Sequence, residues 1–154
     1  MTRQCIFIAT ALLVSFISGC RETGDNIVII DRYKSPHGYN VQLIAHSPGI
    51  DDPSLDRRCY YKVFINKMEE GRTETALDSQ KKYFKMSLPP NRHLLRVEKW
   101  VLDEKNEKYV KLNNIDQPKP GFIYFDVPEN RIVTIELKVN RDGKAEYSMS
   151  HEKE

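Results

Sequence analysis

One segment near the C-terminal end constrains the fold more than any other. Within residues 132–140 the apolar side chains stand at alternate positions, Val133, Ile135, Leu137 and Val139, and polar side chains separate them. Successive side chains of a β-strand point to opposite faces of its sheet, so this alternation predicts a strand with one buried and one solvated face. Such strands are typical of antiparallel sheets, because the helices that cover parallel sheets bury both faces.

The same alternation recurs in shorter segments, at residues 39–46, 59–66, 83–88 and 144–149. Turn-forming residues separate the segments, in NRDG (140–143), LPPNRH (88–93) and QPKPGF (117–122). Gly143 can adopt a positive φ, so NRDG predicts a hairpin that joins the strands on either side of it. One segment, from Thr73 to Lys81, carries a weak helical signal. We therefore predict an all-β protein that forms a single antiparallel β-sandwich or a small barrel.

The N-terminus has a different composition from the rest of the chain. It carries one cation, Arg3, which is followed by an uncharged apolar run from Cys5 to Ile17. This run is shorter than the roughly 20 apolar residues of a transmembrane helix, and it has the length of a signal-peptide core. Ser18 and Gly19 end the run, and their small side chains suit the shallow subsites of a signal peptidase. The sequence therefore predicts a cleaved N-terminal signal peptide.

The residues at the predicted cleavage site, Ile17-Ser18-Gly19-Cys20, resemble the lipobox of bacterial lipoproteins. The resemblance implies cleavage before Cys20, a diacylglycerol on the Cys20 thiol and acylation of the new amine. Two or three acyl chains anchor a protein stably, whereas one chain holds it reversibly. Arg21 differs from the Asp that marks inner-membrane retention in many Gram-negative lipoproteins, so the outer membrane is favoured. The alternatives are an ordinary secretory signal or an anchor helix, with Cys20 incidental.

These features divide the chain into four parts. They are a signal peptide over residues 1–19, a lipidated tether over 20–26, a β-sandwich domain over 27–150 and a disordered tail over 151–154. The mature chain suits one domain with a real hydrophobic core. With Cys5 removed and Cys20 lipidated, Cys59 has no disulfide partner, and we expect it to be a small buried hydrophobe rather than a nucleophile.

Three segments resemble PEGA-type β-sandwich domains, namely KVFINKMEEG (62–71), MSLPPNRHLLRVEKW (86–100) and VPENRIVTIELKV (127–139). The resemblance implies a small binding or spacer module of a bacterial surface or envelope protein. The sequence departs from the pattern at Asn91 and at Lys67, where the family has turn glycines. Asn tolerates the left-handed region, whereas Lys67 predicts a different turn. We expect His93 to close the turn at residues 88–93 by a hydrogen bond.

The function is predicted from what the sequence contains and lacks. Cations and anions number 24 and 22 and are interleaved, so nothing predicts nucleic-acid binding. No catalytic, metal-ligating or cofactor-binding pattern is present, which predicts a protein that is not an enzyme and has no cofactor. The aromatic residues are too numerous for one face, so either both inner faces take them or some form an exposed contact patch.

Trp100 and Tyr109 are the candidate binding residues. They lie close to the long polar loop predicted from Asp103 to Pro120, and loops of that length are often functional. A rim of Trp and Tyr beside a loop suits sugar or protein binding, and the alternative is that Trp100 belongs to the core. We therefore expect a lipid-anchored envelope lipoprotein that acts as a small binding or structural module on an envelope protein or glycan. The alternative is an assembly or docking lipoprotein of a secretion or envelope-spanning machine.

Overall fold

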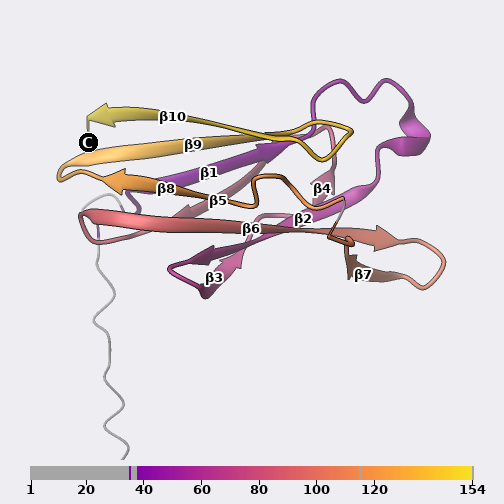
Figure 1. Ribbon diagram of the computed structural model, residues 1–154, viewed down its shortest axis with the longest axis horizontal. Helices are drawn as coiled ribbons and strands as arrows, with labels where there is room; N and C mark the ends of the chain where they lie inside the picture. The colour runs from indigo at the N-terminus through magenta and orange to yellow at the C-terminus, as the bar shows by residue number, and fades with distance from the viewer. Residues whose placement is uncertain (1–34, 36–37, 115, 154) are drawn as a thin grey trace, which may run out of the picture. The chain divides into compact units, whose positions relative to one another are not determined.

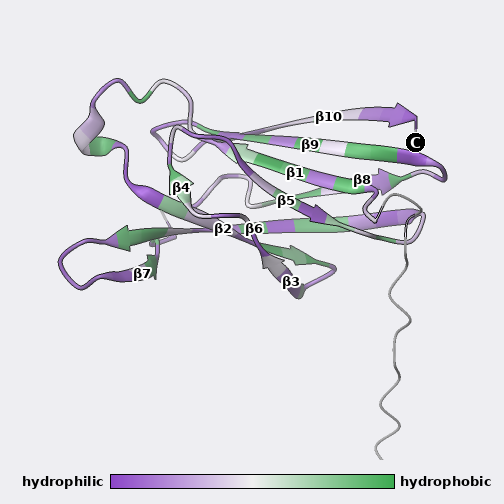
Figure 2. Ribbon diagram, turned by 180° about the vertical axis from the view of Figure 1, so that it is seen from behind, coloured by the Kyte–Doolittle hydropathy of each residue, from purple (hydrophilic) through white to green (hydrophobic). Residues whose placement is uncertain are grey.

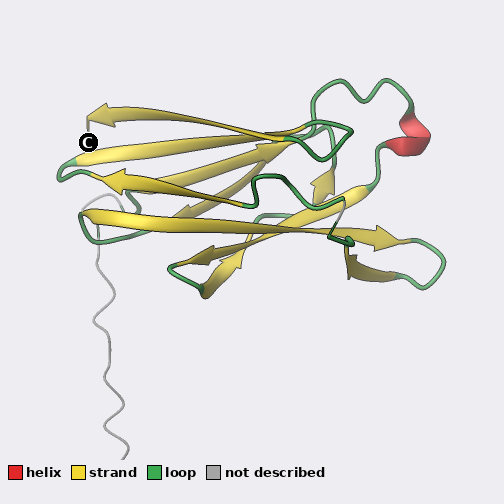
Figure 3. Cartoon of the chain, in the orientation of Figure 1, coloured by secondary structure: helices red, strands yellow, loops and turns green. Residues whose placement is uncertain are grey.

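The computed structural model describes Ser35, residues 38–114 and residues 116–153. The predicted signal peptide, lipobox and tether therefore lie outside the described residues, and so does Cys20. In the described part nearly all of the regular structure is β-strand (Figure 3). One 3₁₀ turn, η1 (Pro53–Leu55), is the single helical element among the described residues. The prediction of an all-β chain is confirmed.

The strands form two sheets that pack face to face as a sandwich (Figure 1). The four-stranded sheet has the order β10 (Ala145–Lys153), β9 (Arg131–Val139), β1 (Val41–His46) and β5 (Lys82–Met86). The six-stranded sheet has the path β3 (Met68–Arg72), β2 (Arg58–Ile65), β6 (Asn91–Asp103) and β7 (Lys108–Lys111). Two further strands complete it, because β4 (Ala76–Leu77) pairs with β2 and β8 (Phe122–Val127) pairs with β6. Most neighbouring strands are antiparallel, and β1 with β9 is a parallel pair.

The core lies between the two sheets and follows the predicted alternation. On β9 the alternate residues Val133, Ile135, Leu137 and Val139 are buried, and the residues between them are partly exposed. Bands of hydrophobic residues recur in the same way along β1, β6 and β9 (Figure 2). Burying these apolar faces against each other is the main force that holds the sheets together.

The long strand β6 positions the outward side chains of the six-stranded sheet. It pairs with β2 along one edge, and along the other edge it pairs first with β8 and then with β7. Its odd-numbered residues from His93 to Val101 are buried, so its even-numbered side chains point away from the core. The register then fixes which outward side chains of the neighbouring strands lie beside them.

Two of the predicted turns have the expected chemistry. The NRDG turn joins β9 to β10, with Gly143 at φ 78° and its N–H bonded to the Asn140 carbonyl at 2.9 Å. The ring of His93 bonds the Pro89 carbonyl at 2.9 Å, so His93 closes its turn as predicted. This bond makes Nε2 the donor, and Nδ1 then accepts from the Asn66 amide at 3.1 Å.

The turn from β2 to β3 shows how Lys67 replaces the expected glycine. Asn66 and Lys67 both adopt positive φ, at 50° and 76°, as in a two-residue type I′ hairpin. The Asn66 side chain stabilises this geometry, because its carbonyl oxygen accepts from the Leu94 N–H at 3.0 Å. The turn is therefore built with a lysine in the left-handed region.

Three predictions were wrong. The segment from Thr73 to Lys81 is not helical, because Thr73 bonds the Tyr61 backbone through both its N–H and its hydroxyl and so ties the chain to β2. The predicted loop from Asp103 to Pro120 contains β7, which pairs with the end of β6. Residues 151–153 are not a disordered tail, because they continue β10 and pair with Arg131–Val133.

Gly71 is required where β3 passes close to the other sheet. It has φ 154°, and a Cβ at this position would lie 2.8 Å from Cε2 of Phe84. We expect Gly71→Ala to lower the free energy of unfolding by about 1–3 kcal/mol, because the Phe84 ring must move. Urea unfolding measures the loss. In a Phe84→Leu background the same substitution should cost less, and equal losses in both backgrounds would refute the steric explanation.

Candidate functional site

The outer face of the six-stranded sheet carries an unusual number of rings. We call it the aromatic face, and its aromatic residues are Tyr60, Phe64, Trp100, Tyr109, Phe122 and Tyr124. On the outer face of the four-stranded sheet the described strands contribute one Phe, Trp or Tyr side chain, that of Tyr83. A sheet face that is in contact with water normally carries few aromatic residues, as the four-stranded sheet does. The many rings on the six-stranded sheet therefore indicate a contact surface.

The structure brings together the two binding residues that the sequence predicts. Trp100 and Tyr109 both contact Tyr60, which lies opposite Trp100 in the β2–β6 pair. The Tyr60 and Trp100 rings are parallel within 7° with centroids 6.1 Å apart, and the Tyr60 and Tyr109 centroids are 5.1 Å apart. Trp100 is partly exposed on the outer face, so it does not belong to the core between the sheets.

Cationic side chains lie over the rings of this face. The cation-to-centroid distances are 4.8 Å for Arg72 over Tyr60, 5.0 Å for Lys62 over Trp100, 3.7 Å for Arg96 over Phe64 and 5.1 Å for Arg92 over Tyr124. Each such pair contributes about 0.5–1 kcal/mol at an exposed site. Each contact holds the long Arg or Lys side chain along the surface of the sheet and keeps its charged end exposed to solvent.

Some of these cations have anionic partners. Glu98 accepts from Lys111 at 2.8 Å and also from Arg96. Burial by itself raises the pKa of Glu98, but the two cations outweigh it and hold the pKa below its ordinary value. Lys62 bonds Glu69 at 3.2 Å.

The aromatic face as a whole is cationic. Its basic residues are Arg58, Lys62, Arg72, Arg92, Arg96 and Lys111, and its acidic residues are Glu69, Glu98 and Asp126. Arg72 and Arg92 form no ion pair with any of the described residues. Arg58 also forms no ion pair with a described residue, so three arginines carry unpaired positive charge, and two of them, Arg72 and Arg92, are stacked on rings.

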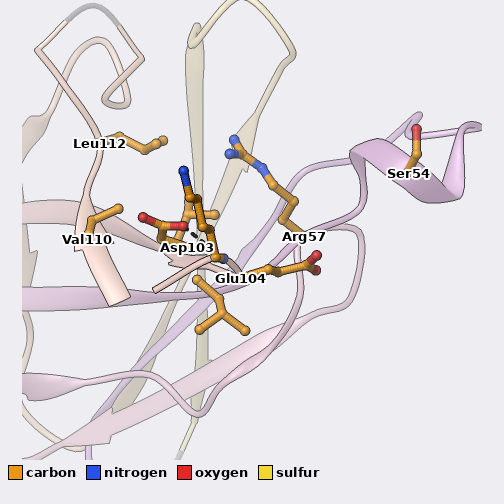
Figure 4. Close-up of a pocket in the computed structure, with 9 residues that line it drawn as sticks. Ser54, Arg57, Asp103, Glu104, Val110 and Leu112 are labelled. Carbon is orange, nitrogen blue, oxygen red and sulfur yellow. Dashed lines mark hydrogen bonds between the residues drawn. The ribbon is translucent and has the colours of Figure 1, made fainter. Parts of the chain in front are cut away.

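Two pockets lie near the loops. The first has a volume of about 370 Å³ and lies between η1 and the β6–β7 hairpin. Figure 4 shows Arg57 extending into it, with Asp103 and Leu112 on the other side. The second has a volume of about 470 Å³ and shares Arg57 and Leu112 with the first. No ring of the aromatic face lines either pocket.

A cluster of polar groups forms part of the wall of the second pocket. Lys99 Nζ bonds Asp78 Oδ2 at 2.5 Å, and Ser47 Oγ donates to Asp78 Oδ1 at 2.7 Å. Ser47 is 3.4 Å from Lys99, which resembles a nucleophile beside a base. The Asp78 carboxylate engages both groups, however, and this arrangement is that of a structural ion pair.

Lys82 belongs to the same cluster and is completely buried. Its ammonium donates to the carbonyl oxygens of Leu77, Asp78 and Gln80, at 2.7, 3.1 and 2.6 Å. Burial lowers the pKa of Lys82. The three carbonyls belong to the turn between β4 and β5, so this lysine fixes the shape of that turn.

The described residues contain neither a metal-binding cluster nor a membrane-spanning helix. Within residues 35, 38–114 and 116–153, no group of three or more His, Cys, Asp or Glu side chains could hold a metal ion. In the same part of the chain, no helix has the length and hydrophobicity needed to cross a membrane.

The comparisons with known proteins identify no relative. The lipobox and the PEGA-like segments therefore remain predictions from the sequence. No protein-family model, curated protein or solved structure matches this chain.

Proposed function

We propose that this protein is a bacterial envelope lipoprotein that binds a protein or glycan without catalysing a reaction. In this proposal the lipid on Cys20 holds the chain in the membrane, with the outer membrane favoured, and residues 20–26 tether the sandwich to it. The aromatic face makes the contact. The observation that carries the proposal is the parallel Tyr60–Trp100 pair with Tyr109 beside it, on an outer sheet face that ordinary solvation does not explain.

Two other rings of the aromatic face are exposed, which supports this role. Phe122 is 53% exposed and Tyr124 is 55% exposed, and the two rings contact each other with centroids 6.5 Å apart. Trp, Tyr and Arg are the residues most enriched at binding hot spots, because they bury a large area and can still form polar contacts. All three types occur on the aromatic face.

The anchor is tested with Cys20→Ala. We expect this chain to accumulate as an uncleaved precursor that incorporates no radiolabelled palmitate, because the resemblance to a lipobox makes the Cys20 thiol the acceptor. Electrophoretic mobility and autoradiography measure both effects. Cys5→Ala and Cys59→Ala are matched controls and should be processed and labelled normally. Normal processing or labelling of Cys20→Ala would show that the protein is not a lipoprotein.

The contact surface is tested by cross-linking in intact envelopes. We expect Tyr60→Ala combined with Trp100→Ala to lose at least about 2 kcal/mol of binding free energy, which is the range of hot-spot truncations. Cross-linked complexes formed by the unchanged protein should therefore become faint. Tyr83→Ala on the opposite sheet is the control and should leave them unchanged. If both variants cross-link as the unchanged protein does, the aromatic face is not the contact surface.

A docking role in a larger assembly is the second candidate. It is favoured by the breadth of the aromatic face, which spans β2, β6, β7 and β8, since a broad sheet face suits a folded partner domain better than a small ligand. Co-purification of a membrane protein in a fixed ratio would distinguish this role from that of a free binding module.

A further inference from the structure

We propose that the aromatic face docks against an acidic protein surface, and that Arg72 and Arg92 bind carboxylates of that partner. This inference rests on the proposed binding function of the face, and it adds the chemistry of the partner. It predicts that the two arginines decide which partner is bound, while the neighbouring rings supply apolar contact.

Arg72 and Arg92 are held against aromatic rings without an anionic partner among the described residues. The Arg72 guanidinium lies 4.8 Å from the centre of the Tyr60 ring, and that of Arg92 lies 5.1 Å from the centre of the Tyr124 ring. A guanidinium that stacks on a ring keeps the N–H groups of its edge free, and this planar fork matches a carboxylate. Both residues are exposed, and neither forms an ion pair with a described residue.

Nearby cations, by contrast, are already paired. Lys62 bonds Glu69, and Arg96 and Lys111 share Glu98. Among the described residues no such ion pair engages Arg72 or Arg92, although Asp126 lies opposite Arg92 in the β6–β8 register. Holding the two guanidinium groups in place before binding reduces the entropy lost when a partner carboxylate arrives.

The cations that cover the rings favour a protein partner over a glycan. A sugar stacks on the open face of an aromatic ring, whereas cations already cover one face of Tyr60, Trp100, Phe64 and Tyr124. No ring of the aromatic face lines either of the two pockets, where a small ligand would be enclosed. On the aromatic face, exposed Phe122 offers an apolar contact of the kind found in protein interfaces.

Trp100 provides a direct measurement, because it is the one tryptophan in the sequence. The full-length protein in detergent micelles is titrated with poly-L-glutamate and, separately, with polygalacturonate of the same charge, and Trp100 emission is followed. We expect poly-L-glutamate to change the emission and to bind more tightly than polygalacturonate. Arg72→Glu combined with Arg92→Glu should weaken poly-L-glutamate binding by about tenfold or more, because two charge-assisted contacts are lost.

A matched control separates specific contacts from net charge. Lys85→Glu combined with Lys138→Glu makes the same charge change on outward positions of the four-stranded sheet, and it should weaken binding much less. Equal weakening by the two double variants would overturn the inference, because binding would then depend on overall charge. Equal or tighter binding of polygalacturonate would also overturn it, and would leave a glycan-binding function in place.

Failure of the inference and failure of the proposed function give different results. If neither probe changes the emission while the envelope cross-links still depend on Tyr60 and Trp100, the acidic partner is excluded and the contact surface stands. If neither probe binds and the cross-links do not depend on these rings, both proposals fail.

Discussion

Asp78→Ala is expected to lower the free energy of unfolding by about 3–5 kcal/mol, because it leaves a buried ammonium without its counter-ion. The Lys99 side chain is 8% exposed and bonds Asp78 Oδ2 at 2.5 Å. The other oxygen of the same carboxylate accepts from Ser47 and from the Cys59 thiol. Urea unfolding followed by Trp100 emission measures the loss.

A second variant separates the charge from the packing. Asp78→Leu combined with Lys99→Met replaces the ion pair with apolar groups, and such replacements are often close to neutral. We expect most of the lost stability to return in this double variant. Glu129→Ala at an exposed position is the control and should change stability by less than about 0.5 kcal/mol. If the double variant is as unstable as Asp78→Ala, the loss comes from packing.

The alternation of the sequence contains a signal for the two buried lysines near Asp78. Lys99 is in phase with the buried residues Val97 and Val101, and Lys82 is in phase with Phe84 and Met86. A charged residue at a core position predicts either a strand end or a buried partner. The partner, Asp78, belongs to a turn that the sequence predicted to be helical, so the pairing could not be found without the tertiary structure.

Local alternation was sufficient to predict the strand faces. It identified the buried faces of β1, β2 and β9 and the hairpin at Gly143. It could not predict which strands pair, because pairing depends on contacts between distant segments. The parallel pair of β1 and β9 is an example, since the chain between these two strands includes every strand of the other sheet.

The candidate site could be predicted only in part, because it too depends on which strands pair. Trp100 and Tyr109 were identified as binding residues because of their type and their position next to a polar segment. Their contact with Tyr60 depends on the register of β6 with both β2 and β7. Because β7 lies inside the segment that was predicted to be a loop, the sequence could not show that the three rings meet on one face. The same register also determines which cationic side chains lie over the rings.

The position of the Cys59 thiol beside the Asp78 carboxylate affects its acidity and therefore its reactivity. Burial raises the pKa of the Cys59 thiol from 9.0 to about 12, and the charge of Asp78 adds to the effect. At a pH near 8 a shift of this size lowers the thiolate fraction by roughly a thousandfold. We therefore expect iodoacetamide to alkylate Cys59 at least about a thousandfold more slowly in the folded protein than in urea. Mass spectrometry of the Cys59 peptide measures both rates.

The same shift sets the direction of a pH effect on stability. The unfolded chain releases the thiol proton near pH 9, whereas the folded chain keeps it until about pH 12. Because folding favours the protonated form, this contribution to stability is complete below pH 9 and is lost as the pH rises towards 12. Cys59→Ala should remove this part of the loss between pH 9 and pH 12. Equal alkylation rates in the folded and unfolded chain would instead show that the thiol is accessible and that the cluster around Asp78 opens readily.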